Sequence, residues 1–310
     1  MGERMRESPI VFLTIDVEDW YHIPSVTGSP FSVYTDVEEF FQKWQDRYDY
    51  LTEPTKRILN LLDEFNLRAT FFVVADVIEH YPGLVENIAE NGHEIACHGL
   101  HHEIYIHPKT KRPLLTKEEF KERTKNARKL LKKESKQRIM GYRAPGAYIG
   151  GWMVDTLEEL GFRYDSSVSV NSLYNKTDSN LQGVSTIPYY PKKGSLECGS
   201  EIRKILEIPW PYLDILGFKL PTAGGPMLRF LGARVILMGI KQSLRRGPAL
   251  FYFHPIDISN EKFPKIGNKR PLYWSIKGEI VEKRIRYILR KLLDMRVNLI
   301  PISEYMEEVL

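Results

Sequence analysis

The chain is organised around the stretch Gly92-His93-Glu94-Ile95-Ala96-Cys97-His98-Gly99-Leu100-His101-His102-Glu103. A short alternating run leads into His98 and His102, which stand four residues apart in a segment that holds half of the chain's 8 histidines. Residues at that spacing share one face of a helical turn, where two imidazoles can hold one divalent metal ion. We therefore predict a metal site here, in preference to a solvated polar loop.

The composition is that of an ordinary globular protein of 310 residues, with 43% hydrophobic and 27% charged residues. This length suffices for one large α/β domain or two small ones. The net charge of +4 is mild, and the basic residues between Lys109 and Arg138 are interleaved with glutamates. Such a mixture is typical of an exposed helix face, so we expect no nucleic-acid partner.

The N-terminal segment lacks a long apolar core, and no apolar run in the chain is long enough to span a bilayer. We expect a cytoplasmic protein, with action beside a membrane left open. The two cysteines, Cys97 and Cys198, form neither a disulfide framework nor a Cys-x-x-Cys zinc site. Cys97 adjoins His98 and is a candidate thiol nucleophile, but its neighbours favour a small buried residue.

Strands and helices alternate along the chain, which predicts an α/β fold with a parallel sheet or barrel. The first strand, 9–15, is apolar and β-branched, as in strands that are buried on both faces. Further strands are expected at 69–74, 162–164, 206–210, 249–253 and 297–301. Helices are expected at 37–48, 55–65, 83–90, 116–133, 152–160, 227–244 and 277–293 and from Ser303, and residues 171–201 read as a long surface excursion.

Polar residues follow several of these strands, at the end where active sites lie in parallel α/β folds. They are Asp16, Glu18 and Asp19 after the first strand, His98 and His102, Arg143, and His254. Two imidazoles and one carboxylate make a three-ligand site with an open position, the arrangement of catalytic zinc, which lowers the pKa of a water in that position.

The remaining groups suit amide hydrolysis. A second carboxylate can act as general base, Arg143 can keep that base ionised, and His254 can protonate a leaving amine. Backbone amides around Pro145 can stabilise an oxyanion. Aromatic residues near the expected rim could stack on a ligand, with core packing as the alternative for each; they are Trp20, Tyr21, Tyr189, Tyr190 and Trp210.

These motifs resemble those of the polysaccharide deacetylases of carbohydrate esterase family 4, the NodB-homology domain. The resemblance runs from about Pro9 to Ile302 and is carried by four ordered motifs: 14–19, 98–102, Arg143-Ala144-Pro145 and Phe253-His254-Pro255. The Asp-Val-Glu-Asp-Trp form of the first motif resembles a subgroup linked to surface and capsular polysaccharide assembly.

The resemblance implies a distorted (β/α) barrel over residues 9–302, with a C-terminal helix, 303–310, packed on it. It implies metal-dependent removal of an N-acetyl group from an N-acetylated sugar in a polysaccharide or glycan precursor. Asp16 would be the base, His98 and His102 the ligands and His254 the acid. Zn²⁺ is the expected metal, and Co²⁺, Ni²⁺ or Fe²⁺ fits the same ligands.

The chain departs from the family pattern at two points. Val17 stands where the family has a second aspartate, so the third ligand is Glu18 if the strand continues and Asp19 if the chain turns at once. The family's Asp–Trp pair that orients the acid has no clear counterpart, and Asp165 is a candidate. Two other functions stay open: an allantoinase-like hydrolase of small cyclic or linear amides, and a catalytically silent glycan-binding protein.

Overall fold

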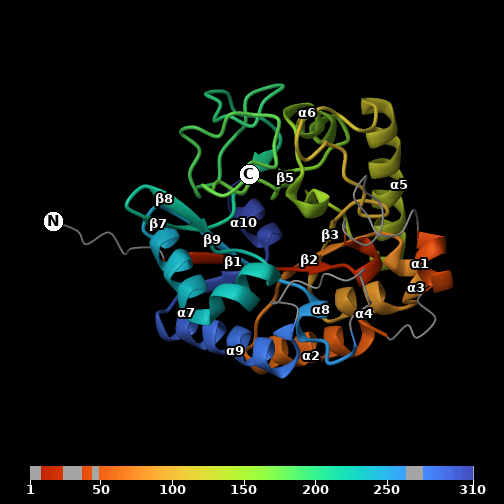
Figure 1. The fold of residues 1–310 in the computed structure, drawn as a ribbon, viewed down its shortest axis with the longest axis vertical. Coiled ribbons are helices and arrows are strands. Elements are labelled where there is room, and N and C mark those ends of the chain that lie inside the picture. Colours follow the sequence, from red (N-terminus) through yellow and green to blue (C-terminus); the bar gives the residue numbers. More distant parts are fainter. Residues whose placement is uncertain (1–7, 24–36, 44–48, 263–274, 310) are drawn as a thin grey trace.

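The centre of this computed structural model, which describes residues 8–23, 37–43, 49–262 and 275–309, is a curled eight-stranded sheet (Figure 1). Its strands are β1 (Ile10–Val17), β2 (Thr70–Val73), β3 (Glu94–Cys97), β4 (Gly141–Tyr142), β5 (Tyr164–Asp165), β6 (Leu206–Glu207), β9 (Ala249–Phe253) and β10 (Asn298–Ile300). They are ordered β10-β1-β2-β3-β4-β5-β6, β9 also pairs with β1, and every pair is parallel. The predicted distorted (β/α) barrel is thus confirmed.

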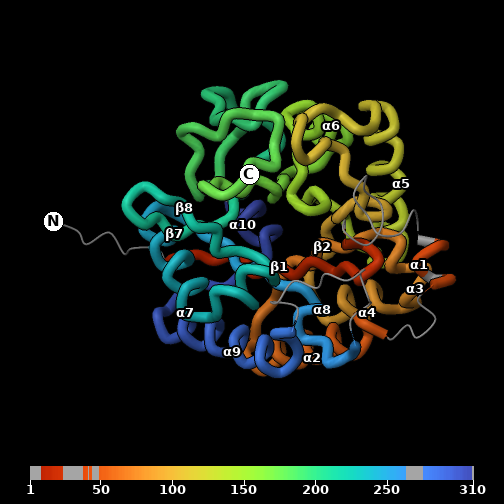
Figure 2. Tube along the Cα trace, viewed as in Figure 1, coloured from red at the N-terminus to blue at the C-terminus, as the bar shows by residue number. Residues whose placement is uncertain are grey.

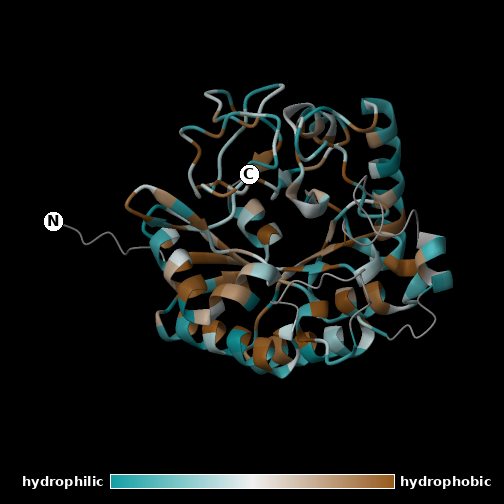
Figure 3. Ribbon diagram, in the orientation of Figure 1, coloured by the Kyte–Doolittle hydropathy of each residue, from teal (hydrophilic) through white to brown (hydrophobic). Residues whose placement is uncertain are grey.

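Helices cover the outside of the sheet. They are α1 (Val37–Lys43), α2 (Thr52–Glu64), α3 (Val77–His80), α4 (Leu84–Glu90), α5 (Lys117–Ser135), α6 (Gly151–Glu159), α7 (Gly225–Leu244), α8 (Pro255–Ile258), α9 (Glu279–Asp294) and α10 (Ile302–Val309). Neighbours in space pack on one another: α7 on α9, α9 on α8, α8 on α2, α4 on α5, and α5 on α6. In Figure 3 the central strands are mainly hydrophobic and α5 is mainly hydrophilic, as its solvent-facing position requires.

Successive side chains of a strand point to opposite faces of the sheet, and here both faces are buried. Phe12 belongs to a cluster inside the curled sheet, whereas Val11 and Leu13 belong to the larger cluster under the helices. Phe72, Ala96 and other side chains from the neighbouring strands share the inner cluster with Phe12. Side chains two and four positions beyond Phe12 therefore continue along the inner face toward the carboxyl end of β1.

Helix α10 closes the amino end of the barrel. Ile302 and Met306 belong to the inner cluster, and the Tyr305 ring stands edge-on to Phe12 with centroids 5.1 Å apart. The Ile302 N–H donates to Thr70 Oγ1 at 2.8 Å, at the first residue of β2. Because this end is plugged, the carboxyl end is the one available for a site.

Most predicted elements are present, with some differences. An antiparallel hairpin, β7 (Tyr212–Ile215) and β8 (Phe218–Pro221), was not predicted. Residues 171–201 contain no strand of the sheet and no helix, as predicted, and form the irregular green segment of Figure 2. The predicted helix 37–48 is seen up to Lys43, and its remainder lies outside the described residues. In the part of the chain that is described, no helix has both the length and the apolar character needed to cross a membrane.

We predict that Ile302→Ala destabilises the protein by about 2–5 kcal/mol, because Ile302 is fully buried in the inner cluster and its truncation leaves a cavity. The matched control is Ile202→Ala, since Ile202 is 85% exposed and should change the free energy of unfolding by less than about 0.5 kcal/mol. Denaturant unfolding measures both. Equal effects would contradict the assignment of α10 as the plug of the barrel.

Candidate metal centre and active site

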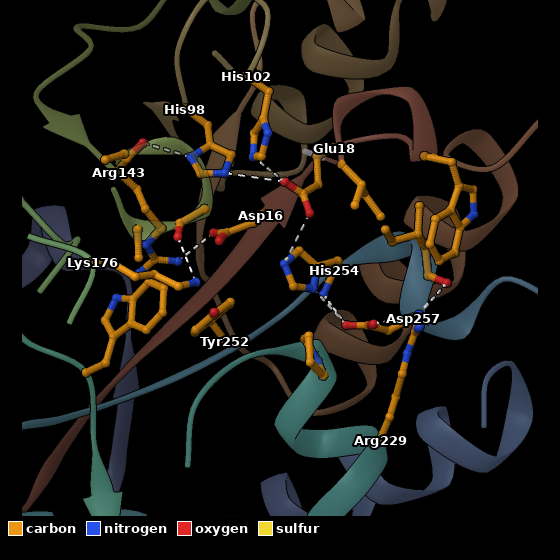
Figure 4. Close-up of a pocket in the computed structure, with 18 residues that line it drawn as sticks. Asp16, Glu18, His98, His102, Arg143, Lys176, Arg229, Tyr252, His254 and Asp257 are labelled. Carbon is orange, nitrogen blue, oxygen red and sulfur yellow. Dashed lines mark hydrogen bonds and ion pairs between the residues drawn. The ribbon is translucent and has the colours of Figure 1, made fainter. Parts of the chain in front are cut away.

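A cavity of about 420 Å³ lies at the carboxyl ends of β1, β3, β4 and β9. Its charged and imidazole side chains are Asp16, Glu18, His98, His102, Arg143, Lys176, Arg229, His254 and Asp257. Most of these residues follow strand ends that are far apart in sequence, while Lys176 comes from the irregular segment and Arg229 from α7 (Figure 4). Of the predicted site residues, Asp19 is the one that does not line this cavity.

Glu18, His98 and His102 form a compact donor cluster, and all three are buried. Glu18 Oε2 lies 2.6 Å from His102 Nε2 and 3.6 Å from His98 Nε2. Donor atoms around an ion with bonds of about 2.0–2.2 Å stand roughly 3–4 Å apart, so one ion fits between them after small adjustments. The two nitrogens and one oxygen suit zinc and related divalent metals.

The hydrogen bonding of the imidazoles also fits a metal. The His98 Nδ1–H donates to the Arg143 carbonyl oxygen at 2.8 Å, which leaves the Nε2 lone pair of His98 facing the cluster. Neither ring nitrogen of His102 makes a hydrogen bond of good geometry within the described residues. A buried imidazole without such a bond is costly, and a metal ion would satisfy it.

The two histidines do not lie on a helix, so the helical turn assumed for their spacing is wrong. They belong to a loop after β3 that turns at Gly99, whose φ is +87°, and His102 itself has a φ of +60°. A Cβ atom on residue 99 would lie 3.1 Å from Pro145 Cγ, so a glycine lets this loop approach the turn that follows Arg143. The loop brings both rings to Glu18.

Glu18 and Asp19, the two candidates for the third ligand, point in different directions. Glu18 continues the inner-face periodicity of Phe12 and Asp16, as expected if the strand continues. Asp19 instead caps a short 3₁₀ helix, Trp20–His22, through Trp20 N–H and accepts a hydrogen bond from Tyr81 Oη–H. Asp19 is therefore occupied in local structure, away from the donor cluster.

Asp16 is held by Arg143, as the sequence predicts. Arg143 Nη1 donates to Asp16 Oδ1 at 2.5 Å and to Thr14 Oγ1 at 3.1 Å, and the guanidinium is fully buried. Arg143 Nε donates to the Ser166 carbonyl oxygen at 2.9 Å. These contacts leave the carboxylate of Asp16 facing the cavity in a fixed orientation.

His254 is held by an aspartate that sequence reasoning missed. The His254 Nδ1–H donates to Asp257 Oδ2 at 2.9 Å, and Arg229 Nη2 binds Asp257 Oδ1 at 2.8 Å. Residue 225, at the start of α7, must be glycine because a Cβ there would lie 2.3 Å from the Asp257 carboxylate. The sequence His254-Pro-x-Asp257 could have predicted this contact. A proline and an acidic residue in the first turn are typical of the start of a helix, and the acidic side chain there turns back toward the residue before the helix.

The charges shift two pKa values in opposite directions. Burial alone would raise the pKa of Glu18, but the imidazoles of His102, His98 and His254 outweigh it and hold this pKa well below its ordinary value. Burial would lower the pKa of His254, yet Asp257, with Glu18 and Asp16, raises it to about 9. His254 is therefore protonated near neutral pH, the state that a proton donor needs.

The structure also gives the positions of Asp165, Cys97 and the expected rim aromatics. Asp165 bonds to Ser167 Oγ at 2.7 Å behind the cavity, so Asp257 and not Asp165 orients His254. Cys97 is fully buried and does not line the cavity, and burial raises the pKa of its thiol to about 12, as expected for a small buried residue beside the site. Of the expected rim aromatics, Trp20 and Trp210 line the cavity, while Tyr21, Tyr189 and Tyr190 do not.

Two family models match the chain. Residues 41–164 match polysaccharide deacetylase, and residues 172–298 match a domain of unknown function (DUF3473). A peptidoglycan-N-acetylglucosamine deacetylase of Bacillus cereus is 28% identical over 109 residues, which is 35% of this chain and 47% of the relative. The match thus spans about half of that relative's length.

Several solved structures share the fold. A protein of Mycobacterium smegmatis assigned as a polysaccharide deacetylase superposes with a TM-score of 0.63 at 20% identity, covering 100% of this chain and 92% of that one. The structure of Puue allantoinase superposes with a TM-score of 0.58 at 15% identity, covering 96% of this chain and 89% of that one. A CE4 family pseudoenzyme from Bacillus anthracis superposes with a TM-score of 0.52 at 12% identity, covering 96% of this chain and 65% of that one. These neighbours share the fold of the chain, and the polysaccharide deacetylase model matches residues 41–164 of it.

We predict that Glu18→Gln weakens binding of one Zn²⁺ ion per chain, whereas Asp19→Asn leaves it in place. The reason is that Glu18 belongs to the donor cluster and Asp19 caps the adjacent 3₁₀ helix. Metal content after dialysis against a weak chelator, with a thermal melt of each variant, measures the difference. Loss of zinc from a well-folded Asp19→Asn protein, with zinc retained in Glu18→Gln, would reverse the assignment.

We predict that Asp257→Asn lowers the pKa of His254 from about 9 toward the ordinary imidazole value of about 6.5, because the carboxylate that favours the protonated ring is lost. Titration of histidine ring protons by NMR in metal-free protein measures this, with the His254 resonance assigned from His254→Gln. Asp294→Asn, at an exposed surface pair, is the control. The same His254 pKa in the wild type and Asp257→Asn would contradict the orienting contact.

Proposed function

We propose that this protein, whose residues 41–164 match the polysaccharide deacetylase model, is a metal-dependent hydrolase that removes the N-acetyl group from an N-acetylated sugar. The single observation that carries the proposal is the convergence of three groupings on one cavity. These are the donor cluster, a carboxylate held by an arginine, and an imidazole held by an aspartate. Metal-assisted hydrolysis of an amide can use all three, and the imidazole is important because the amine is a poor leaving group without a proton.

Glu18, His98 and His102 would hold the metal, which when bound supplies Lewis-acid polarisation of the acetyl carbonyl and lowers the pKa of a water. Zn²⁺ is the first choice, with Co²⁺, Ni²⁺ or Fe²⁺ compatible with the same donors. Asp16 accepts a proton from the attacking water, and the ion pair with Arg143 holds the Asp16 carboxylate in place. Arg143 is thus a positioning residue for the base.

His254 Nε2 delivers a proton to the departing amine, while Asp257 on Nδ1 fixes the ring. The acyl–nitrogen bond breaks as the water oxygen bonds to the carbonyl carbon, so the products are acetate and the free amine. The amides of Ala147 and Tyr148 are used inside the turn, to the carbonyls of Ala144 and Pro145. Gly146 lines the cavity, and its N–H takes part in neither of these two hydrogen bonds. It is therefore the amide in this turn that we expect to stabilise the oxyanion.

The cavity draws on both matched segments, which supports one functional unit over residues 9–302. His98, His102 and Arg143 come from the first segment, and His254 and Asp257 come from the second. Residues 303–310 would then belong to the plug at the amino end. We assign the Asp-Val-Glu-Asp-Trp motif to the subgroup that handles surface polysaccharides or their precursors, so the substrate is an N-acetylhexosamine within such a glycan.

We predict that the zinc-loaded protein releases acetate from N-acetylated oligosaccharides and that Asp16→Asn lowers this rate by about 10²–10⁴-fold while keeping its metal, as for a lost general base. Acetate release with metal analysis tests both statements. Turnover of allantoin-like cyclic amides with no release from any N-acetylated sugar would favour the allantoinase-like alternative. Sugar binding without turnover of either substrate would favour a silent glycan-binding protein.

A further inference from the structure

The charged side chains of the cavity are paired, with one exception. Asp16 binds Arg143, Asp257 binds Arg229 and His254, and Glu18 faces the histidines. Lys176 lines the same cavity, but it has no carboxylate within ion-pair distance in the described part of the chain. Its Nζ donates to the Gly146 carbonyl oxygen at 2.9 Å and lies 5.3 and 5.0 Å from the ring centroids of Tyr148 and Tyr174.

The backbone around Lys176 is fixed. Thr177 is buried, its N–H donates to Asn175 Oδ1 at 2.8 Å, and residue 177 forms a parallel bridge with Ile149. These contacts tie the long irregular segment to the turn that follows Arg143. The backbone from which Lys176 enters the cavity is therefore anchored.

An ammonium group in such a place is costly unless it has a partner. Burial lowers the pKa of Lys176 to about 8, with Glu18 acting in the opposite direction. The group is still mostly charged at neutral pH. A carbonyl oxygen and two aromatic rings compensate it only in part, whereas an anionic ligand would give a charge-assisted hydrogen bond and recover the missing stabilisation.

The position of Lys176 separates it from the proton-donating side. In Figure 4 its ammonium lies on the side of Arg143 and Asp16, while His254, Asp257 and Arg229 lie on the other side of the cavity. A substrate whose acetamide lies at the donor cluster could place another of its groups at Lys176. A group bound by Lys176 is thus part of the substrate, but not the bond that is broken.

We propose that Lys176 binds an anionic group of the substrate, so that the site takes acidic N-acetylated glycans or precursors in preference to neutral ones. This inference rests on the proposed deacetylase function. The anion is a carboxylate on a neighbouring sugar or a phosphate on a glycan precursor, because both accept a charge-assisted hydrogen bond from an ammonium. Lys176 is then a specificity residue, and it comes from the segment that matches a domain of unknown function.

The test compares three probes on the metal-loaded protein. N-acetylated chito-oligosaccharide is neutral, a hyaluronan oligosaccharide carries a carboxylate on each second sugar, and N-acetylglucosamine 1-phosphate carries a phosphate. The wild type should show higher kcat/KM on one acidic probe, and which one it is identifies the source of the anion. Lys176→Met should reduce the ratio of kcat/KM for that probe over the neutral probe by about 10- to 100-fold, mainly through KM.

Two variants sharpen the comparison. Lys176→Arg keeps the charge and should restore much of the preference, whereas Lys193→Met, at an exposed lysine outside the cavity, should leave it unchanged. If Lys176→Met lowers kcat equally on all probes, the ammonium stabilises the reacting carbonyl and the proposal is wrong. A wild type that prefers neutral substrate also overturns it.

Failure of the proposed function can be recognised separately. If the wild type releases no acetate from any probe, the deacetylase assignment fails, and calorimetric binding of the same probes decides the inference. Tighter binding of the acidic probe by the wild type, lost in Lys176→Met, would support an anion site without deacetylation. Equal binding of acidic and neutral probes would exclude it.

Discussion

A fully buried guanidinium is the constraint on which the rest of this site depends. Arg143 has no access to water, so its N–H groups must find acceptors inside the protein. Asp16, Thr14 and Ser166 supply them, and the guanidinium also lies 4.0 Å from the centroid of the Phe72 ring. The carbonyl oxygen of Arg143 in turn fixes the ring of His98. One residue therefore orients both the proposed base and a proposed metal ligand.

The fold and the first residues of the site were predictable because they depend on short-range periodicity. Side chains on a strand repeat every two residues, so Glu18 was expected to share the inner face with Asp16 if the strand continued, with Asp19 as the alternative if the chain turned at once. The repeated strand–helix order predicted the parallel sheet, because a helix between two strands lets both run in the same direction. The β7–β8 hairpin was missed because its turn, Leu216-Gly217, does not interrupt an alternating apolar pattern strongly enough to mark two strands.

The parts of the site that escaped prediction depend on contacts between distant segments. Arg229 touches Asp257 only because a glycine lets α7 approach the turn after β9, and neither residue alone suggests the contact. His98 and His102 meet Glu18 through a loop with two left-handed residues, whereas the spacing suggested a helical turn. Lys176 lies in a segment without periodicity, so its place in the cavity followed only from the three-dimensional structure.

The pairing of β1 has a consequence for the synthesis of the chain. Thr14 Oγ1 reaches the carbonyl oxygen of Phe251, which lies 237 residues later, and β9 and β10 complete the surroundings of β1. At roughly 5–20 residues per second, one edge of this apolar strand waits about 10–50 seconds on the ribosome for its partner. An unpaired apolar edge is prone to associate with other chains. Until β9 has been made, this edge of β1 therefore lacks the partner that covers it in the folded protein.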